Sequence, residues 1–297
     1  MTAAAALASF ELEYSGRSQW LRRLLPGGEG TNVVGVLPAR GARQRTLVLV
    51  GHHDAAHTGL MWHPRLVAGG DARAARTHRR ASFALIPEAA LLLAAASRRR
   101  LPRRGAAAAL ALAAALTLQC GLAATVPGAN DNATGVAGLL ALVERLSAER
   151  PDGLELVALM AGCEESGMGG MAAWLHGNRR LLDARRTLVV GLDTIGSGMP
   201  VVTAAEGGMW PVRYRDEDLL LAERAAGRAG VPLRRWRLGG WTDPALARLS
   251  GLPAVSILSV RDGGFPNYHR PSDTPERVDW RSVQQCVQLV EALIREW

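Results

Sequence analysis

The stretch that decides the fold is "LVLVGHHDAAHTG", residues 47–59, in which a short apolar run is followed by a glycine and a polar cluster. Such a run is typical of a strand that is buried on both faces. His52 and Asp54 follow it at the carboxyl end, which is where open α/β sheets bind their ligands. Imidazole and carboxylate groups placed together indicate a metal site, and a polar loop after a buried strand fits this stretch equally well.

Short apolar runs and longer helical patterns alternate along most of the chain. Strands are expected at 45–51, 154–162, 186–193 and 253–260, and helices at 8–25, 133–149, 169–182, 216–230 and 281–297. Residues 31–51 suggest two strands paired as a hairpin around a polar turn. This alternation predicts an α/β fold with three α/β/α layers and a mixed, mostly parallel central sheet.

One segment departs from this alternation. "ASFALIPEAALLLAAAS" (81–97) and "AAAALALAAALTLQCGLAATVPG" (106–128) are apolar and flank the cationic turn "RRRLPRRG" (98–105). We therefore expect an inserted apolar helical hairpin at 71–127, with 1–70 and 128–297 forming a catalytic domain. Helices of roughly 25 to 30 Å approach the thickness of the bilayer core, so the hairpin can be transmembrane. A soluble hairpin buried in a partner subunit is the alternative.

The amino-terminal residues lack the pattern of a secretory signal. We expect membrane association through residues 81–127 with a cytoplasmic catalytic domain, or a cytoplasmic protein if the hairpin is not inserted. The formal charge of +8 is concentrated in one segment, since nine arginines lie between Asp71 and Gly105 against two acidic residues. Because this basic charge is local, no nucleic-acid partner is expected.

More metal-binding side chains follow the other predicted strands or precede helices. They are Asp131 in "NDNATGVA", Glu164 and Glu165 in "CEESG", Asp193 in "GLDTIG" and His269 in "YHRPSD". Each has an ordinary explanation by itself, because an aspartate before a helix is usually a cap and paired glutamates are usually solvated. Together, however, buried carboxylates repel one another and need a cation to hold them.

In this order, the motifs resemble those of the co-catalytic zinc exopeptidases of peptidase family twenty-eight (clan MH). That family groups bacterial leucyl-type aminopeptidases, glutamate carboxypeptidases and glutaminyl cyclases. The resemblance covers residues 30–54 and 128–280 and includes "TDPALARLSGLPAVSI" before the last motif. The chain departs from the family pattern in one place: 76 residues (55–130) separate Asp54 from Asp131, where the family has a short connection.

The resemblance implies a site with two zinc ions and a peptide substrate. The implied metal ligands are His52, Asp131, Glu165, Asp193 and His269. Asp131 would bridge the two ions, with His52 and Asp193 on one and Glu165 and His269 on the other. The resemblance further implies that Glu164 is the general base and that Asp54 fixes the tautomer of His52.

The leading functional prediction is an aminopeptidase that removes N-terminal residues from peptides. One alternative is a glutaminyl-peptide cyclotransferase-like acyltransferase with one metal ion. Another is a catalytically inactive, membrane-associated binding module. The inserted hairpin can dock the catalytic face towards a membrane or act as a lid, and His57, Trp62 and His63 can line a substrate pocket or serve only in loop packing.

Overall fold

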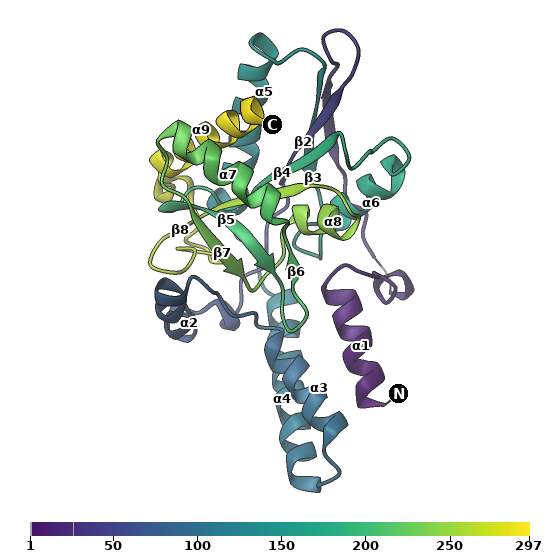
Figure 1. Cartoon of the computed structure of the whole chain (residues 1–297). Helices are drawn as coiled ribbons and strands as arrows, with labels where there is room; N and C mark the ends of the chain where they lie inside the picture. Colours follow the sequence, from purple (N-terminus) through teal and green to yellow (C-terminus); the bar gives the residue numbers. More distant parts are fainter. Residues whose placement is uncertain (1, 26) are drawn as a thin grey trace.

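The computed structural model describes residues 2–25 and 27–297, which fold around one eight-stranded mixed sheet (Figure 1). The strands run in the order β1-β3-β2-β4-β8-β5-β6, and β7 pairs with β5. Their bounds are β1 (Val33–Leu37), β2 (Arg45–His52), β3 (Leu154–Ala161), β4 (Thr187–Leu192), β5 (Met199–Glu206), β6 (Val212–Arg213), β7 (Arg234–Leu238) and β8 (Ala254–Val260).

The four central strands, β3, β2, β4 and β8, are parallel to one another, whereas β1 and β5 pair antiparallel to the outer two. All but a few of their side chains are buried, which is why the sequence shows them as nearly continuous apolar runs. His52 is opposite Ala161 in the pairing of β2 with β3. The residues that follow these strands therefore emerge at one edge of the sheet.

Helices cover both faces of the sheet, as the α/β/α prediction requires. On one face lie α5 (Thr134–Ala148), α7 (Asp216–Ala229) and α9 (Trp280–Glu296), and on the other α6 (Gly169–Asn178) and α8 (Asp243–Leu249) (Figure 1). In α9 the buried residues recur with helical spacing, for example Val283, Val287, Val290 and Ile294. The fold class predicted from the sequence is confirmed.

Two helices project from the sheet as a pair, α3 (Leu85–Ala96) and α4 (Arg100–Gly121) (Figure 1). The helix α1 (Ala3–Tyr14) packs against α3, and α2 (Pro64–Thr77) precedes the pair. The predicted cationic turn at 98–105 was wrong in extent, because α4 begins at Arg100. Pro102 lies in the first turn of α4, where its missing N–H removes no intrahelical hydrogen bond. We call α3 and α4 the inserted hairpin.

Two local predictions were wrong. The helix expected at 8–25 instead runs from Ala3 to Tyr14, because the Thr2 hydroxyl caps its start and Gly16 adopts a left-handed conformation after its end. The strands within 31–51 do not pair with each other, since β1 pairs with β3. The buried strand β2 instead takes β3 and β4 as neighbours, which leaves the exposed β1 at the sheet edge.

Candidate metal centre

The structure brings all five predicted metal-binding side chains together at the carboxyl edge of the sheet. His52 ends β2, Asp193 directly follows β4, and Glu165 lies in the loop after β3. Asp131 lies immediately before α5, and His269 lies in the loop after β8. All are buried except Glu165, which is half-buried.

Asp131 lies between the two imidazoles. Its Oδ1 is 3.2 Å from His52 Nε2, and its Oδ2 is 3.1 Å from His269 Nε2. Each histidine also has a second carboxylate of its own: Asp193 Oδ2 is 3.8 Å from His52 Nε2, and Glu165 Oε2 is 3.3 Å from His269 Nε2. The side chains thus form two groups that share Asp131.

Several of these atoms lack the partners that buried polar atoms require. Within the described residues, Asp131 Oδ2, Glu165 Oε1 and His269 Nε2 are buried and make no hydrogen bond of good geometry, although Asp131 Oδ2 and His269 Nε2 lie 3.1 Å apart. Ligand atoms of His52, Asp131 and Glu165 all lie within 4.8 Å of one another, a spacing that can hold a metal ion. Nitrogen and oxygen donors of this kind fit zinc. The residues present therefore fit the metal that the sequence predicts.

The pKa values of the buried side chains show that the site stabilises positive charge. Burial opposes the charged form of His269, yet the Glu165 charge and the close contact with the Asp131 carboxylate raise its pKa to about 9. Burial likewise opposes charge on His52, but its contacts with Asp131 and Asp54 raise its pKa well above the usual value. Burial raises the pKa of Asp193 to about 6. Protonated imidazoles thus balance the carboxylates, a task that a bound cation would take over.

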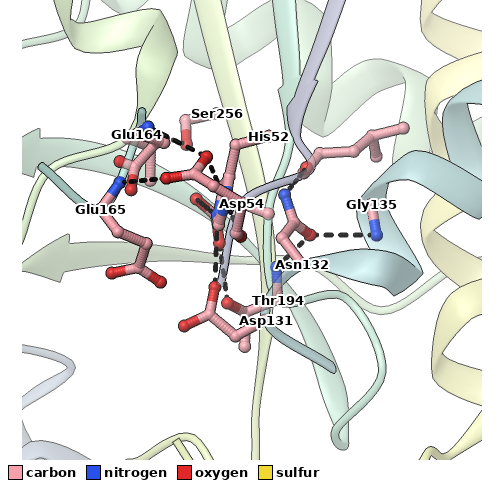
Figure 2. Close-up of polar contacts among 12 residues, drawn as sticks. His52, Asp54, Asp131, Asn132, Gly135, Glu164, Glu165, Thr194 and Ser256 are labelled. Atoms are coloured by element: carbon pink, nitrogen blue, oxygen red, sulfur yellow. Dashed lines mark hydrogen bonds and ion pairs between the residues drawn. The ribbon is translucent and has the colours of Figure 1, made fainter. Parts of the chain in front are cut away.

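Asp54 ties the end of β2 to the loop that carries both glutamates (Figure 2). Its Oδ1 accepts a hydrogen bond from the Glu164 N–H at 3.0 Å, and its Oδ2 accepts one from the Glu165 N–H at 3.1 Å. The His52 Nδ1 is 3.6 Å from Asp54 Oδ1 and 3.1 Å from the Asp54 carbonyl oxygen. The Asp54 carboxylate therefore holds the glutamate backbone, and its carbonyl contacts the imidazole.

Asp273 and Asn132 position the loop that carries Asp131. The Asp273 carboxylate accepts the N–H groups of Asn130 at 2.9 Å and of Asp131 at 3.1 Å. The Asn132 amide accepts the N–H groups of Gly135 and Thr194 and donates to the Leu192 carbonyl (Figure 2). Asp273 therefore anchors this loop through two backbone N–H groups.

Sequence reasoning assigned no role to Asp243, the first residue of α8. It is buried, and its Oδ1 has no hydrogen-bond partner among the described residues. Burial raises its pKa to about 7, with contributions from the charges of Asp193 and Asp54, so it lies at the margin of the site. The only feature of the sequence that points to Asp243 is its position in the stretch "TDPALARLSGLPAVSI".

Aromatic rings enclose His269. The Tyr268 ring stacks on the imidazole with centroids 3.8 Å apart, and the Trp62 ring meets it edge-on at 4.5 Å. Trp62 and His57 line the cavity beside the site, as one of the two sequence interpretations proposed. His63 instead accepts a hydrogen bond from the Arg65 N–H at the start of α2.

The three-layer α/β/α fold, with imidazoles and carboxylates gathered at the carboxyl ends of the parallel strands, defines an α/β protein with a candidate metal-binding site. The model of peptidase family M28 matches residues 111–294, more than half of the chain. The chain belongs to peptidase family M28, and the family predicted from its motifs is confirmed.

The individual relatives are matched over only part of their own length. Carboxypeptidase G2 from Pseudomonas sp. (strain RS-16) is 32% identical over 99 residues, which are 33% of this chain and 21% of that protein. An aminopeptidase from Aneurinibacillus sp. strain AM-1 superposes with a TM-score of 0.56 at 17% identity, covering 89% of this chain and 47% of that one. The chain thus spans about half the length of this aminopeptidase, and the likeness shows the fold.

A glutaminyl cyclase from Bacteroides thetaiotaomicron, bound to N-acetylhistamine, shares the fold as well. It superposes with a TM-score of 0.56 at 15% identity, covering 89% of this chain and 77% of that one. The zinc aminopeptidase BSAP from Bacillus subtilis gives a TM-score of 0.55 at 16% identity, with 89% and 49% coverage.

Proposed function

We propose that the protein is a di-zinc aminopeptidase that removes N-terminal residues from peptides. The observation that carries this proposal is the position of Asp131, with one oxygen facing each imidazole. Because each histidine has a further carboxylate of its own, the arrangement provides ligands for two ions that share Asp131. Membership of the M28 family supports zinc as the metal.

In this proposal the two adjacent glutamates have different tasks. Bound zinc would polarise the scissile carbonyl and lower the pKa of a water molecule. Glu165 faces His269 as a ligand, while Glu164 takes the proton of the water and returns it to the leaving amine. Asp54 accepts the two backbone N–H groups and so holds the backbone from which both glutamate side chains extend.

The first test is the metal content per chain together with the hydrolysis of aminoacyl p-nitroanilides. We expect two zinc ions per chain and amide cleavage that a chelator abolishes. One ion or none, without amide cleavage, would overturn the proposal. Glu164→Gln should abolish turnover while both zinc ions stay bound, and near-full activity of this variant would refute Glu164 as the base.

A second candidate is cyclisation of N-terminal glutamine with release of ammonia. The glutaminyl cyclase that shares this fold, of which the chain spans 77%, is compatible with this candidate. This candidate predicts one zinc ion per chain and ammonia release from a glutaminyl peptide, without cleavage of p-nitroanilides. A protein that binds zinc and performs neither reaction would be a binding module.

We further propose that the inserted hairpin rests on a membrane surface. Within residues 2–25 and 27–297, α4 with its 22 residues is the one helix long and apolar enough to cross a bilayer. The 12 residues of α3 extend about 18 Å, which is less than the roughly 30 Å of the bilayer core. Exposed leucines lie along both helices, and exposed arginines cluster at the turn between them: Leu92, Leu93, Leu112, Leu118, Arg99, Arg103 and Arg104.

Co-sedimentation with lipid vesicles tests this attachment. Because apolar side chains and cationic groups are both exposed on the hairpin, we expect binding to anionic vesicles and weaker binding to neutral ones. No binding to either the anionic or the neutral vesicles would overturn this membrane attachment. Leu93→Glu on the exposed face should weaken binding, whereas Leu220→Glu, also exposed but on α7, should leave it unchanged.

A further inference from the structure

A cavity of about 1050 Å³ joins the candidate metal centre to the inserted hairpin. Asp54, Glu165 and His269 line one part of it, so the cavity is continuous with the site. Leu91 of α3 and Leu110 of α4 line another part. Its volume is at the upper end of the range for small-molecule pockets, about 300–1,000 Å³.

Away from the metal-binding side chains the cavity wall is mostly apolar. Phe10 and Tyr14 of α1, Phe83, Leu91 and Ala114 contribute to it. Small side chains on α4 leave the space that larger ones would fill. An apolar wall gains free energy by burying hydrocarbon and loses it by burying charge, so the occupant of this part is apolar.

The cavity is deeper than any genetically encoded aliphatic side chain. Cys120, near Glu165, and Leu110 both line it, and they lie ten residues apart on α4. Ten helical residues extend about 15 Å. A hydrocarbon chain with bonds of about 1.5 Å advances roughly 1.25 Å per carbon, so this depth corresponds to about 12 carbons. A leucine side chain would fill only the mouth.

We propose that this cavity binds an unbranched aliphatic chain of about eight to twelve carbons on the residue whose carboxyl group forms the scissile amide. The inference rests on the proposed amide hydrolysis at the metal centre and specifies its substrate class. The inserted hairpin then takes part in substrate binding, because α3 and α4 supply the walls that contact the aliphatic chain of the substrate.

The test is a series of p-nitroanilides of unbranched 2-amino acids with side chains of three, four, six, eight and ten carbons. Each methylene buried in the cavity should raise kcat/KM about threefold to fourfold, which is the fold-change that about 0.8 kcal/mol per methylene produces. We expect this rise to continue to at least eight carbons with zinc-loaded protein. A maximum at six carbons or fewer would overturn the proposal.

Ala114→Trp places a large ring in the cavity, and Ala115→Trp places the same ring on an exposed position of α4 outside the cavity lining. Ala114→Trp should abolish the rise in kcat/KM beyond four carbons, whereas Ala115→Trp should keep it. Thermal denaturation of both variants verifies that they fold. An unchanged length dependence in folded Ala114→Trp would refute the assignment of this cavity.

A binding measurement separates failure of the cavity from failure of the proposed hydrolysis. Calorimetric titration with the free amino acids of the same series needs no turnover. A Kd that falls with chain length in the unaltered protein and stays flat in Ala114→Trp supports the cavity even when no amide is cleaved. A Kd independent of chain length in the unaltered protein overturns it.

Discussion

Replacing Asp54 with asparagine tests how the candidate metal centre is held together. The Asp54 carboxylate accepts one hydrogen bond from the Glu164 N–H and one from the Glu165 N–H. An asparagine keeps one acceptor oxygen and turns an NH₂ group towards the other N–H. The substitution therefore removes one charge-assisted hydrogen bond and places two donors face to face, while the shape of the side chain is preserved.

The expected magnitude follows from these contacts. A hydrogen bond to a charged group contributes about 1.5–3 kcal/mol, so the free energy of unfolding should fall by about 2–3 kcal/mol. For a chain of 297 residues the loss lowers Tm by roughly 3–5 °C. Displacing the two glutamates should reduce zinc affinity or kcat/KM by about 10-fold to 100-fold, as is usual for groups that orient metal ligands.

The assay compares Asp54→Asn with Asp218→Asn. The Asp218 carboxylate also accepts a backbone N–H, that of Ala254 at 3.1 Å, but at the start of β8 and so at the opposite edge of the sheet. Both variants should lose stability, and only Asp54→Asn should lose zinc affinity in a chelator competition and activity on p-nitroanilides. Unchanged zinc affinity and kcat/KM in Asp54→Asn would refute the reasoning.

Three further outcomes are expected. Zinc at 100 times its Kd should stabilise the chelator-treated protein by about 2.7 kcal/mol, seen as a rise in Tm of several degrees, and an unchanged Tm would count against the site. Asp273→Ala frees the N–H groups of Asn130 and Asp131 and should cost about 3–5 kcal/mol in urea unfolding together with a weaker zinc affinity. Burial and the neighbouring Glu88 raise the pKa of Glu11 to about 7, so the folded protein binds a proton that the unfolded chain releases near pH 4.5. Stability should therefore fall between about pH 4.5 and pH 7, by up to about 3 kcal/mol, and Glu88→Gln should flatten this slope in Tm measurements. A slope unaltered in Glu88→Gln would contradict the assignment.

The side chains of the candidate metal centre could be predicted because each has a local signal. His52 and Asp193 follow long apolar runs, and Glu164 and Glu165 follow another closely. In a parallel sheet such runs must end at one edge, so the sequence predicts proximity without long-range information. The distances between the groups, and the hydrogen bonds of Asp54 to the glutamate loop, depend on loop conformations that no periodicity describes.

The elements that sequence reasoning missed lack such signals. In β7 three of the five residues are exposed or half-exposed arginines, and α8 is only seven residues long, too short to show a helical period. The partner of β1 was predicted wrongly because neighbouring strands usually pair, whereas burial of β2 on both faces required β3 beside it. In each case tertiary packing, and not local sequence preference, determined the secondary structure or the strand partner.

The predicted metal-binding side chains are widely spaced along the chain, from His52 to His269. During synthesis, the first histidine and its carboxylates leave the ribosome long before the second histidine. Until residue 269 has joined the sheet edge, Asp131 lacks one of its two imidazoles and the site is incomplete. Contacts of such large sequence separation form late in folding. The proposed hydrolytic activity can therefore begin only when most of the domain has been made.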